Sequence, residues 1–191
     1  MNWFFELLIL GLFAGNFLMV KFYGICPFLG LTKKTESAVG MGLAVTFVMV
    51  LASIVTWAIY KALVALDIAY LDIIVFILVI ASLVQIIEIV LKKFVPALYN
   101  SMGIYLPLIT TNCAILAITQ EGVNLELLQV VFNSLFSGLG FLLAMIILAG
   151  IRERIDRSTI AKPFKGFPIT LLAAAMMAMA FSAFVNIAGV S

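Results

Sequence analysis

The chain contains no histidine and few charged residues. None of its 191 residues is histidine, only 10% are charged, and 65% are hydrophobic. Without histidine, the chain cannot supply an imidazole for acid–base catalysis, for a haem or for a zinc site. Soluble domains carry about 25% charged residues, so this composition indicates an integral membrane protein. The basic residues form short clusters between apolar runs, which gives no basic face for nucleic acid.

Cysteine is also scarce, because Cys26 and Cys113 are the only two in the chain. Two cysteines cannot build the disulfide framework of a small secreted domain, and neither belongs to a CxxC pair. The sequence also lacks a P-loop, a dinucleotide-binding fingerprint and a flavin-binding motif, and its connections are too short to fold into a soluble domain. We therefore expect no nucleotide site in this chain.

Six charge-poor runs are each long enough to cross a hydrocarbon core of about 30 Å as a helix of about 20 residues. Helices are favoured over barrel strands because the runs are uniformly apolar and do not alternate. The sequence thus predicts an all-α integral membrane protein with residues 1–191 in a single membrane domain. The expected spans are Asn2–Phe22, Ser37–Val64, Ala69–Leu91, Phe94–Thr119, Leu127–Ile151 and Phe167–Val190.

The basic residues of the connections predict the orientation in the membrane. Nine Lys and Arg residues follow the first, third and fifth spans, whereas the opposite side has Lys61 and several acidic residues. By the positive-inside rule, the basic connections are cytoplasmic and both termini lie outside. The first span then ends towards the cytoplasm near Lys21, whose presence is explained by snorkelling to the interface.

Three spans in each half predict an inverted repeat, since the second half would enter the membrane from the opposite side. The repeats would cover about 1–93 and 94–191, with Cys26 and Cys113 in the first span of each. Continuous helices would hold the two thiols near opposite faces, so we expect each first helix to be interrupted near its cysteine. The expected helix breakers are Gly24, Pro27 and Gly30 around Cys26, and Gly103 and Pro107 before Cys113.

The two cysteines allow more than one interpretation. A buried membrane cysteine can be no more than a small apolar side chain, and a single disulfide would also fit. Symmetric placement beside helix breakers favours a metal site instead. Because two thiolates cannot complete a four-cysteine [2Fe–2S] site, such a site requires two further ligands from another subunit.

Four segments closely resemble the A-type subunits of the bacterial Rnf complexes and, less closely, the E-type subunits of the sodium-pumping NADH:quinone reductases. The similarity covers essentially all six spans. Cys-Pro-Phe after Gly24 and the run Thr-Thr-Asn-Cys ending at Cys113 both favour the Rnf family member. The segments are Val20–Lys34, Gly40–Ala44, Gly103–Ala114 and Ile151–Arg154.

The resemblance implies a subunit, not catalytic alone, of a ferredoxin:NAD⁺ oxidoreductase that couples electron transfer to Na⁺ or H⁺ translocation in the bacterial cytoplasmic (inner) membrane. It implies an inverted pair with a homologous six-helix E-type subunit, beside B-, C-, D- and G-type subunits. The pair would share one [2Fe–2S] cluster, with Cys26 and Cys113 as this chain's two iron ligands. The backbone expected to support the cluster lies at Gly24, Ile25, Pro27, Thr111 and Asn112.

Three other functions remain compatible with the sequence. Within the family, the chain could be the quinone-reductase subunit. The same six-span layout suits a small inverted-repeat secondary transporter with a substrate site at the midplane, which would work without its cysteines. A structural anchor for a soluble enzyme would also tolerate serine at both positions.

Overall fold

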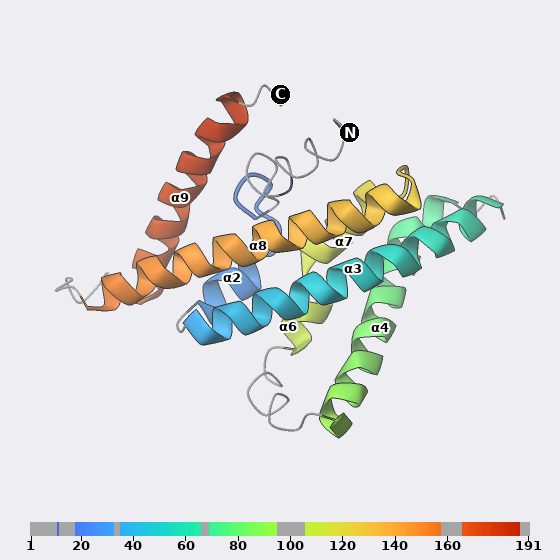
Figure 1. Cartoon of the computed structure of the whole chain (residues 1–191), viewed down its shortest axis with the longest axis horizontal. Coiled ribbons are helices and arrows are strands. Elements are labelled where there is room, and N and C mark those ends of the chain that lie inside the picture. The colour runs from blue at the N-terminus through green and yellow to red at the C-terminus, as the bar shows by residue number, and fades with distance from the viewer. Residues whose placement is uncertain are drawn as a thin grey trace.

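The structure is a computed structural model that describes residues 11, 18–32, 35–65, 69–94, 106–157 and 166–187. Within these residues the regular elements are all helical, as the sequence predicted, and Figure 1 shows their arrangement. The elements are α2 (Ile25–Leu31), α3 (Thr35–Ala65), the 3₁₀ turn η2 (Ala69–Leu71), α4 (Asp72–Phe94), α6 (Leu106–Thr110), α7 (Cys113–Gly122), α8 (Leu127–Asp156) and α9 (Phe167–Ile187).

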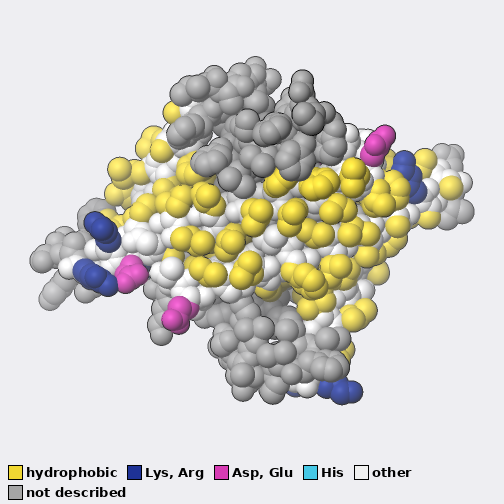
Figure 2. All heavy atoms as spheres, in the orientation of Figure 1, with side chains coloured by type: hydrophobic (Ala, Val, Ile, Leu, Met, Phe, Trp, Pro, Cys, Tyr) yellow, Lys and Arg dark blue, Asp and Glu magenta, His cyan; other side chains and the backbone are white. Residues whose placement is uncertain are grey.

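Three of the described helices are long and apolar enough to cross a membrane, namely α3, α8 and the part of α4 from Asp72 to Ile89. At 1.5 Å per residue, the 31 residues of α3 extend about 46 Å, more than the hydrocarbon core of a bilayer. Figure 2 shows apolar side chains over the visible face and charged side chains towards its ends. On α4, Ile74, Leu78 and Ile89 are more than half exposed, as expected of a surface that meets lipid or another apolar chain.

The helix boundaries differ from the predicted spans where charged residues occur. The helix α8 continues five residues past the expected end at Ile151, and α4 includes Phe94, which we expected to begin the fourth span. An apolar-run criterion excludes such charged terminal turns, although a helix readily includes them. Most of the first expected span and residues 95–105 lie outside the described residues, so the six-helix repeat remains a prediction.

The helices α3 and α8 run antiparallel and pack at two glycines. A Cβ atom added at Gly138 of α8 would lie 2.6 Å from Cγ2 of Thr46 in α3. A Cβ atom added at Gly42 of α3 would overlap Cδ1 of Leu142 in α8 and would lie 3.1 Å from the Cα atom of the same residue. Small residues let the backbones of membrane helices approach closely. These glycines therefore hold the first half of the chain against the second.

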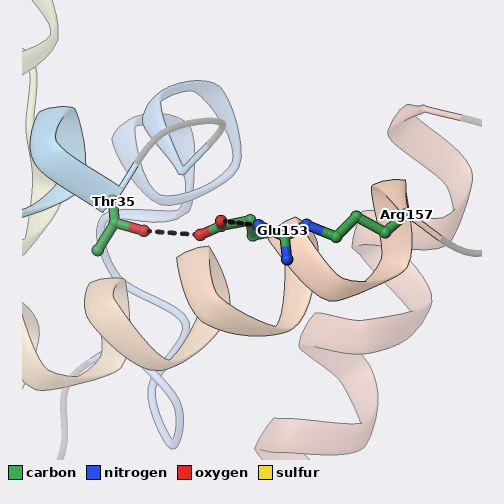
Figure 3. A network of polar contacts seen from close by, with 3 residues as sticks. All are labelled: Thr35, Glu153 and Arg157. Carbon is green, nitrogen blue, oxygen red and sulfur yellow. Dashed lines mark hydrogen bonds and ion pairs between the residues drawn. The ribbon is translucent and has the colours of Figure 1, made fainter.

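Polar contacts hold the two ends of this helix pair. At one end, the indole Nε1–H of Trp57 donates to the carbonyl oxygen of Leu125, just before α8, over 2.9 Å. At the other, Thr35 donates to Glu153 over 3.4 Å, and Arg157 donates to the same carboxylate over 2.7 Å (Figure 3). Because Thr35 begins α3 and Glu153 lies near the end of α8, these contacts agree with the antiparallel orientation.

A buried apolar cluster joins α7 to this pair. Ile115 and Ile118 of α7 are almost fully buried in the same cluster as Val45 of α3 and Met145 of α8. The apolar positions of α7 thus fix it on the scaffold of α3 and α8. Residue Cys113, the first of α7, is placed by this packing.

Candidate functional site

The helix that carries Cys113 begins after a two-residue break. The helix α6 ends at Thr110, and α7 begins at Cys113. Asn112 caps α7, since its Oδ1 accepts a hydrogen bond from the backbone N–H of Ala114 over 3.1 Å. Thr111 is exposed, and both its N–H and its hydroxyl donate to the carbonyl oxygen of Pro107. Cys113 thus occupies the N-terminal end of a ten-residue helix, where the backbone N–H groups carry partial positive charge.

The segment before Cys26 lies directly against this helix start. The backbone N–H of Gly24 donates a hydrogen bond to Sγ of Cys113 over 3.0 Å, across 89 residues of sequence. Gly24 has φ of 83° and ψ of 27°, a left-handed conformation that glycine adopts without strain. A Cβ atom at this position would also lie 2.9 Å from Oδ1 of Asn112 and 3.0 Å from Cε2 of Phe141. Glycine is therefore required both by the backbone angle and by the close approach.

Cys26 follows two residues later and is the second residue of α2. Two residues of extended chain span at most about 7 Å, so the Cα atom of Cys26 lies no farther than this from that of Gly24. Pro27 is buried in the first turn of α2, where the missing N–H costs no helical hydrogen bond. Ile25 is half-buried and, together with Phe28, lines an apolar pocket between α2 and α9.

The two thiols are free and exposed in the isolated chain, so they do not form the disulfide that the sequence allowed. Among the described residues, no group of three or more Cys, His, Asp or Glu side chains gathers into a metal site. The chain thus offers two thiols rather than a complete ligand set. Two exposed thiols on adjoining segments, with an N–H already directed at one sulfur, fit half of a four-thiolate site.

The residue directly before Cys113 has a buried side-chain amide group without a hydrogen-bond partner among the described residues. Asn112 is 5% exposed, and its Nδ2 has no hydrogen-bond partner in the part of the chain that the structure describes. Buried donors are normally paired, because an unpaired one costs about 1–3 kcal/mol. Asn112 thus has an unused donor next to Cys113 in sequence, which a ligand at this position would satisfy.

An ion pair lies close to this junction. Lys21 Nζ contacts Oε1 of Glu121 in the last turn of α7, and the two side chains are 46% and 45% exposed. The predicted topology placed Lys21 at the cytoplasmic end of the first span and Glu121 in a connection on the opposite side, whereas the structure brings their side chains together. Lys21 thus contacts the last turn of α7, whereas Gly24 contacts its first residue.

Arg152 is a second charged residue that the sequence-based prediction misplaced. We expected it in the basic connection after the fifth span, but it lies within α8 and is 8% exposed. Its Nη1 donates to the carbonyl oxygen of Leu29 over 2.9 Å and to Oγ1 of Thr32 over 3.2 Å. Leu29 belongs to the last turn of α2, so this arginine contacts the helix that carries Cys26. The one sign in the sequence that Arg152 could belong to the helix is its position directly after the apolar run that ends at Ile151.

The fold and the paired cysteine segments define an apolar, all-helical membrane protein with its candidate ligands where its two halves meet. A family model described as "Rnf-Nqr subunit, membrane protein" matches residues 4–188. The chain belongs to this family, as its sequence motifs predicted.

Named proteins with similar sequences are A-type subunits of ion-translocating oxidoreductase complexes. The chain is 49% identical over 181 residues to the A-type subunit of the Na⁺-translocating ferredoxin:NAD⁺ oxidoreductase complex of Acetobacterium woodii, covering 93% of this chain and 94% of that protein. It is 49% identical over 177 residues to the A-type subunit of the ion-translocating oxidoreductase complex of Serratia proteamaculans, covering 91% and 92%. The corresponding protein of Erwinia tasmaniensis is 46% identical over 177 residues, covering 91% and 92%.

Proposed function

We propose that this chain is the A-type membrane subunit of an Rnf-type ferredoxin:NAD⁺ oxidoreductase that translocates Na⁺ or H⁺. Its similarity to the named A-type subunits, over more than nine-tenths of its length, supports this assignment. Its partners would be a homologous six-helix protein of the E type together with the B-, C-, D- and G-type subunits. The location would be the bacterial cytoplasmic membrane, with both termini outside and the basic connections inside.

The proposed role of the chain is electron relay through a [2Fe–2S] cluster shared with the homologous subunit. Cys26 and Cys113 would supply two thiolates and the partner two more. The observation that carries the proposal is the Gly24 to Cys113 hydrogen bond, because it joins the two cysteine segments at one sulfur. When bound, the cluster would supply one-electron transfer.

Several groups of the chain would support such a cluster. The N–H of Gly24 already donates to a ligand sulfur, and Nδ2 of Asn112 remains available as a second donor. Hydrogen bonds to sulfur and burial set the potential of an iron–sulfur cluster. The N-terminus of α7 places positive helix-end charge at Cys113, which lowers the cost of a negative group inside the membrane.

The test is iron and acid-labile sulfide analysis, with low-temperature EPR after reduction, on the complex purified with its membrane partner. We expect a [2Fe–2S] signal that is lost in both Cys26→Ser and Cys113→Ser. Ser82→Ala, which removes an exposed hydroxyl on α4, is the control and should retain the signal. Unchanged iron and sulfide in both cysteine variants would reject the shared cluster and favour a transporter or an anchor. If the signal is intact but the complex transfers electrons to quinone, the chain would instead be the E-type subunit of a sodium-pumping NADH:quinone reductase.

A further inference from the structure

The C-terminal end of α2 is held by a buried arginine from the other half of the chain. The last four carbonyl groups of any helix lack partners within it. Here Arg152 Nη1 donates to Leu29 O, and Thr32 Oγ1 donates to Phe28 O over 2.9 Å while accepting from the same Arg152. Thr32 is fully buried. One buried network thus satisfies two of the terminal carbonyls of α2.

Arg152 forms no ion pair with a carboxylate among the described residues. The carboxylates of Glu121 and Glu153 pair instead with Lys21 and Arg157. A buried cation is costly unless it is well compensated. Arg152 is compensated by carbonyl oxygens at the negative end of a helix, where a cation is favoured.

The helix α2 depends on such contacts for its position. It has seven residues, whereas isolated helices shorter than about 12–15 residues are marginal in water. Its N-terminal half holds Cys26, and Leu29 lies three residues further, about 4.5 Å along the helix axis. Because α2 is this short, a displacement of the whole helix at its Leu29 end also displaces the Cys26 thiol.

We propose that Arg152 is a positioning residue that fixes α2, and with it Cys26, and whose buried charge raises the reduction potential of the group that Cys26 ligates. The inference rests on the proposed [2Fe–2S] function. A reduced cluster carries one more negative charge than an oxidised one, so a fixed cation bound at the C-terminal end of the short helix that carries a ligand favours the reduced form. Thr32 accepts a hydrogen bond from the guanidinium and thereby helps to orient it towards α2.

The first measurement is independent of any cluster. Amide hydrogen exchange of the α2 peptide is compared in the full-length membrane chain for wild type, Arg152→Gln and Arg154→Gln. Arg154 lies two residues away and is exposed, so its variant removes the same charge without removing the contact. We expect roughly tenfold or faster exchange of α2 in Arg152→Gln, the factor for loss of a hydrogen bond to a charged group. Exchange in Arg154→Gln should match wild type.

The second measurement is the midpoint potential of the cluster in the purified complex. We expect Arg152→Gln to lower it, Arg152→Lys to restore most of it because the charge is kept, and Arg154→Gln to leave it unchanged. A structural role alone would not make the potential follow the charge. If Arg152→Gln does not accumulate, Thr32→Val replaces it. This variant removes a contact of the guanidinium and keeps the charge, so we expect faster exchange of α2 and a smaller fall in potential than for loss of the charge.

Equal α2 exchange and equal potential in Arg152→Gln and Arg154→Gln would overturn the proposal. Failure of the proposed function is separately visible, since the wild-type complex would then show no [2Fe–2S] signal. In that case the exchange measurement alone tests whether Arg152 positions α2, and unchanged α2 exchange in Arg152→Gln rejects that role.

Discussion

Gly24 donates its backbone N–H to Sγ of Cys113 over 3.0 Å, although 89 residues separate the two. The contact depends on the absence of a side chain at Gly24, because a Cβ atom there would approach Asn112 and Phe141 more closely than van der Waals contact allows. A single position thus joins the segment before Cys26 to the start of α7.

Gly24→Ala should destabilise the chain by about 1–3 kcal/mol, because the new methyl group overpacks the junction and strains a left-handed backbone. Under the proposed function, it should also lower the iron bound per complex. Thermal unfolding and iron analysis check the two effects. The control is Gly30→Ala, since a Cβ atom at Gly30 meets nothing within 4 Å. Equal stability of the two variants would contradict the close approach.

Gly138→Ala should destabilise the contact between α3 and α8 by about 1–3 kcal/mol, since its Cβ would lie 2.6 Å from Thr46. The matched variant is Gly150→Ala in the same helix, where a Cβ atom meets nothing within 4 Å. That change should be neutral or stabilise the chain by up to about 1 kcal/mol, because alanine favours the helix over glycine. Thermal melts of the purified variants in one detergent measure the difference, and similar melting temperatures would argue against this helix contact.

Asn112→Ala should cost about 0.5–2 kcal/mol, because α7 loses its N-cap. Asn112→Asp keeps the capping oxygen and should retain most of the stability, but it replaces the unpaired Nδ2 donor by a carboxylate oxygen. Under the proposed function, Asn112→Asp should therefore lower the cluster potential. The exposed Asn124 supplies the control in Asn124→Asp. A potential that is unaffected by Asn112→Asp would remove this amide from the site.

The Lys21–Glu121 pair should have a coupling energy of only about 0.2–1 kcal/mol in detergent, because both side chains are almost half exposed. A double-mutant cycle with Lys21→Gln and Glu121→Gln measures it from unfolding free energies. The exchanged pair, Lys21→Glu with Glu121→Lys, should recover part of any loss. Strictly additive single changes and no recovery would show that the two groups do not meet.

The predicted orientation can be tested at the two ends of α8. In a chain lacking both native cysteines, Glu126→Cys should react with a membrane-impermeant maleimide added to intact cells. Arg157→Cys should react only after permeabilisation, because it lies on the basic side. The reverse pattern would place the basic connections outside.

The sequence allowed the helical class, the membrane location and the family to be predicted, because all three depend on composition and on long apolar runs. It also identified the segments around Cys26 and Cys113 through their glycine and proline residues. The structure places these segments in contact. The cluster, its partner and the repeat itself remain predictions.

The charged residues were harder to place. Lys21 and Glu121 are 100 residues apart, and Arg152 is 123 residues from Leu29. Hydropathy assigns such residues to loops or interfaces, since it treats each run separately. Their actual positions depend on which helices meet, and helix packing leaves only weak signals in one sequence, such as the small residues Gly42 and Gly138.

The contact between Arg152 and α2 also has a consequence for biosynthesis. The ribosome completes α2 long before it reaches Arg152, which lies 123 residues after Leu29 in the sequence. Until α8 has entered the membrane, the last turn of α2 lacks its contact with Arg152. At that stage α7 also lacks α8, one of the two helices against which it packs. The two thiols can therefore adopt their final arrangement only late in translation, so any cofactor they receive must be delivered to a nearly finished polypeptide.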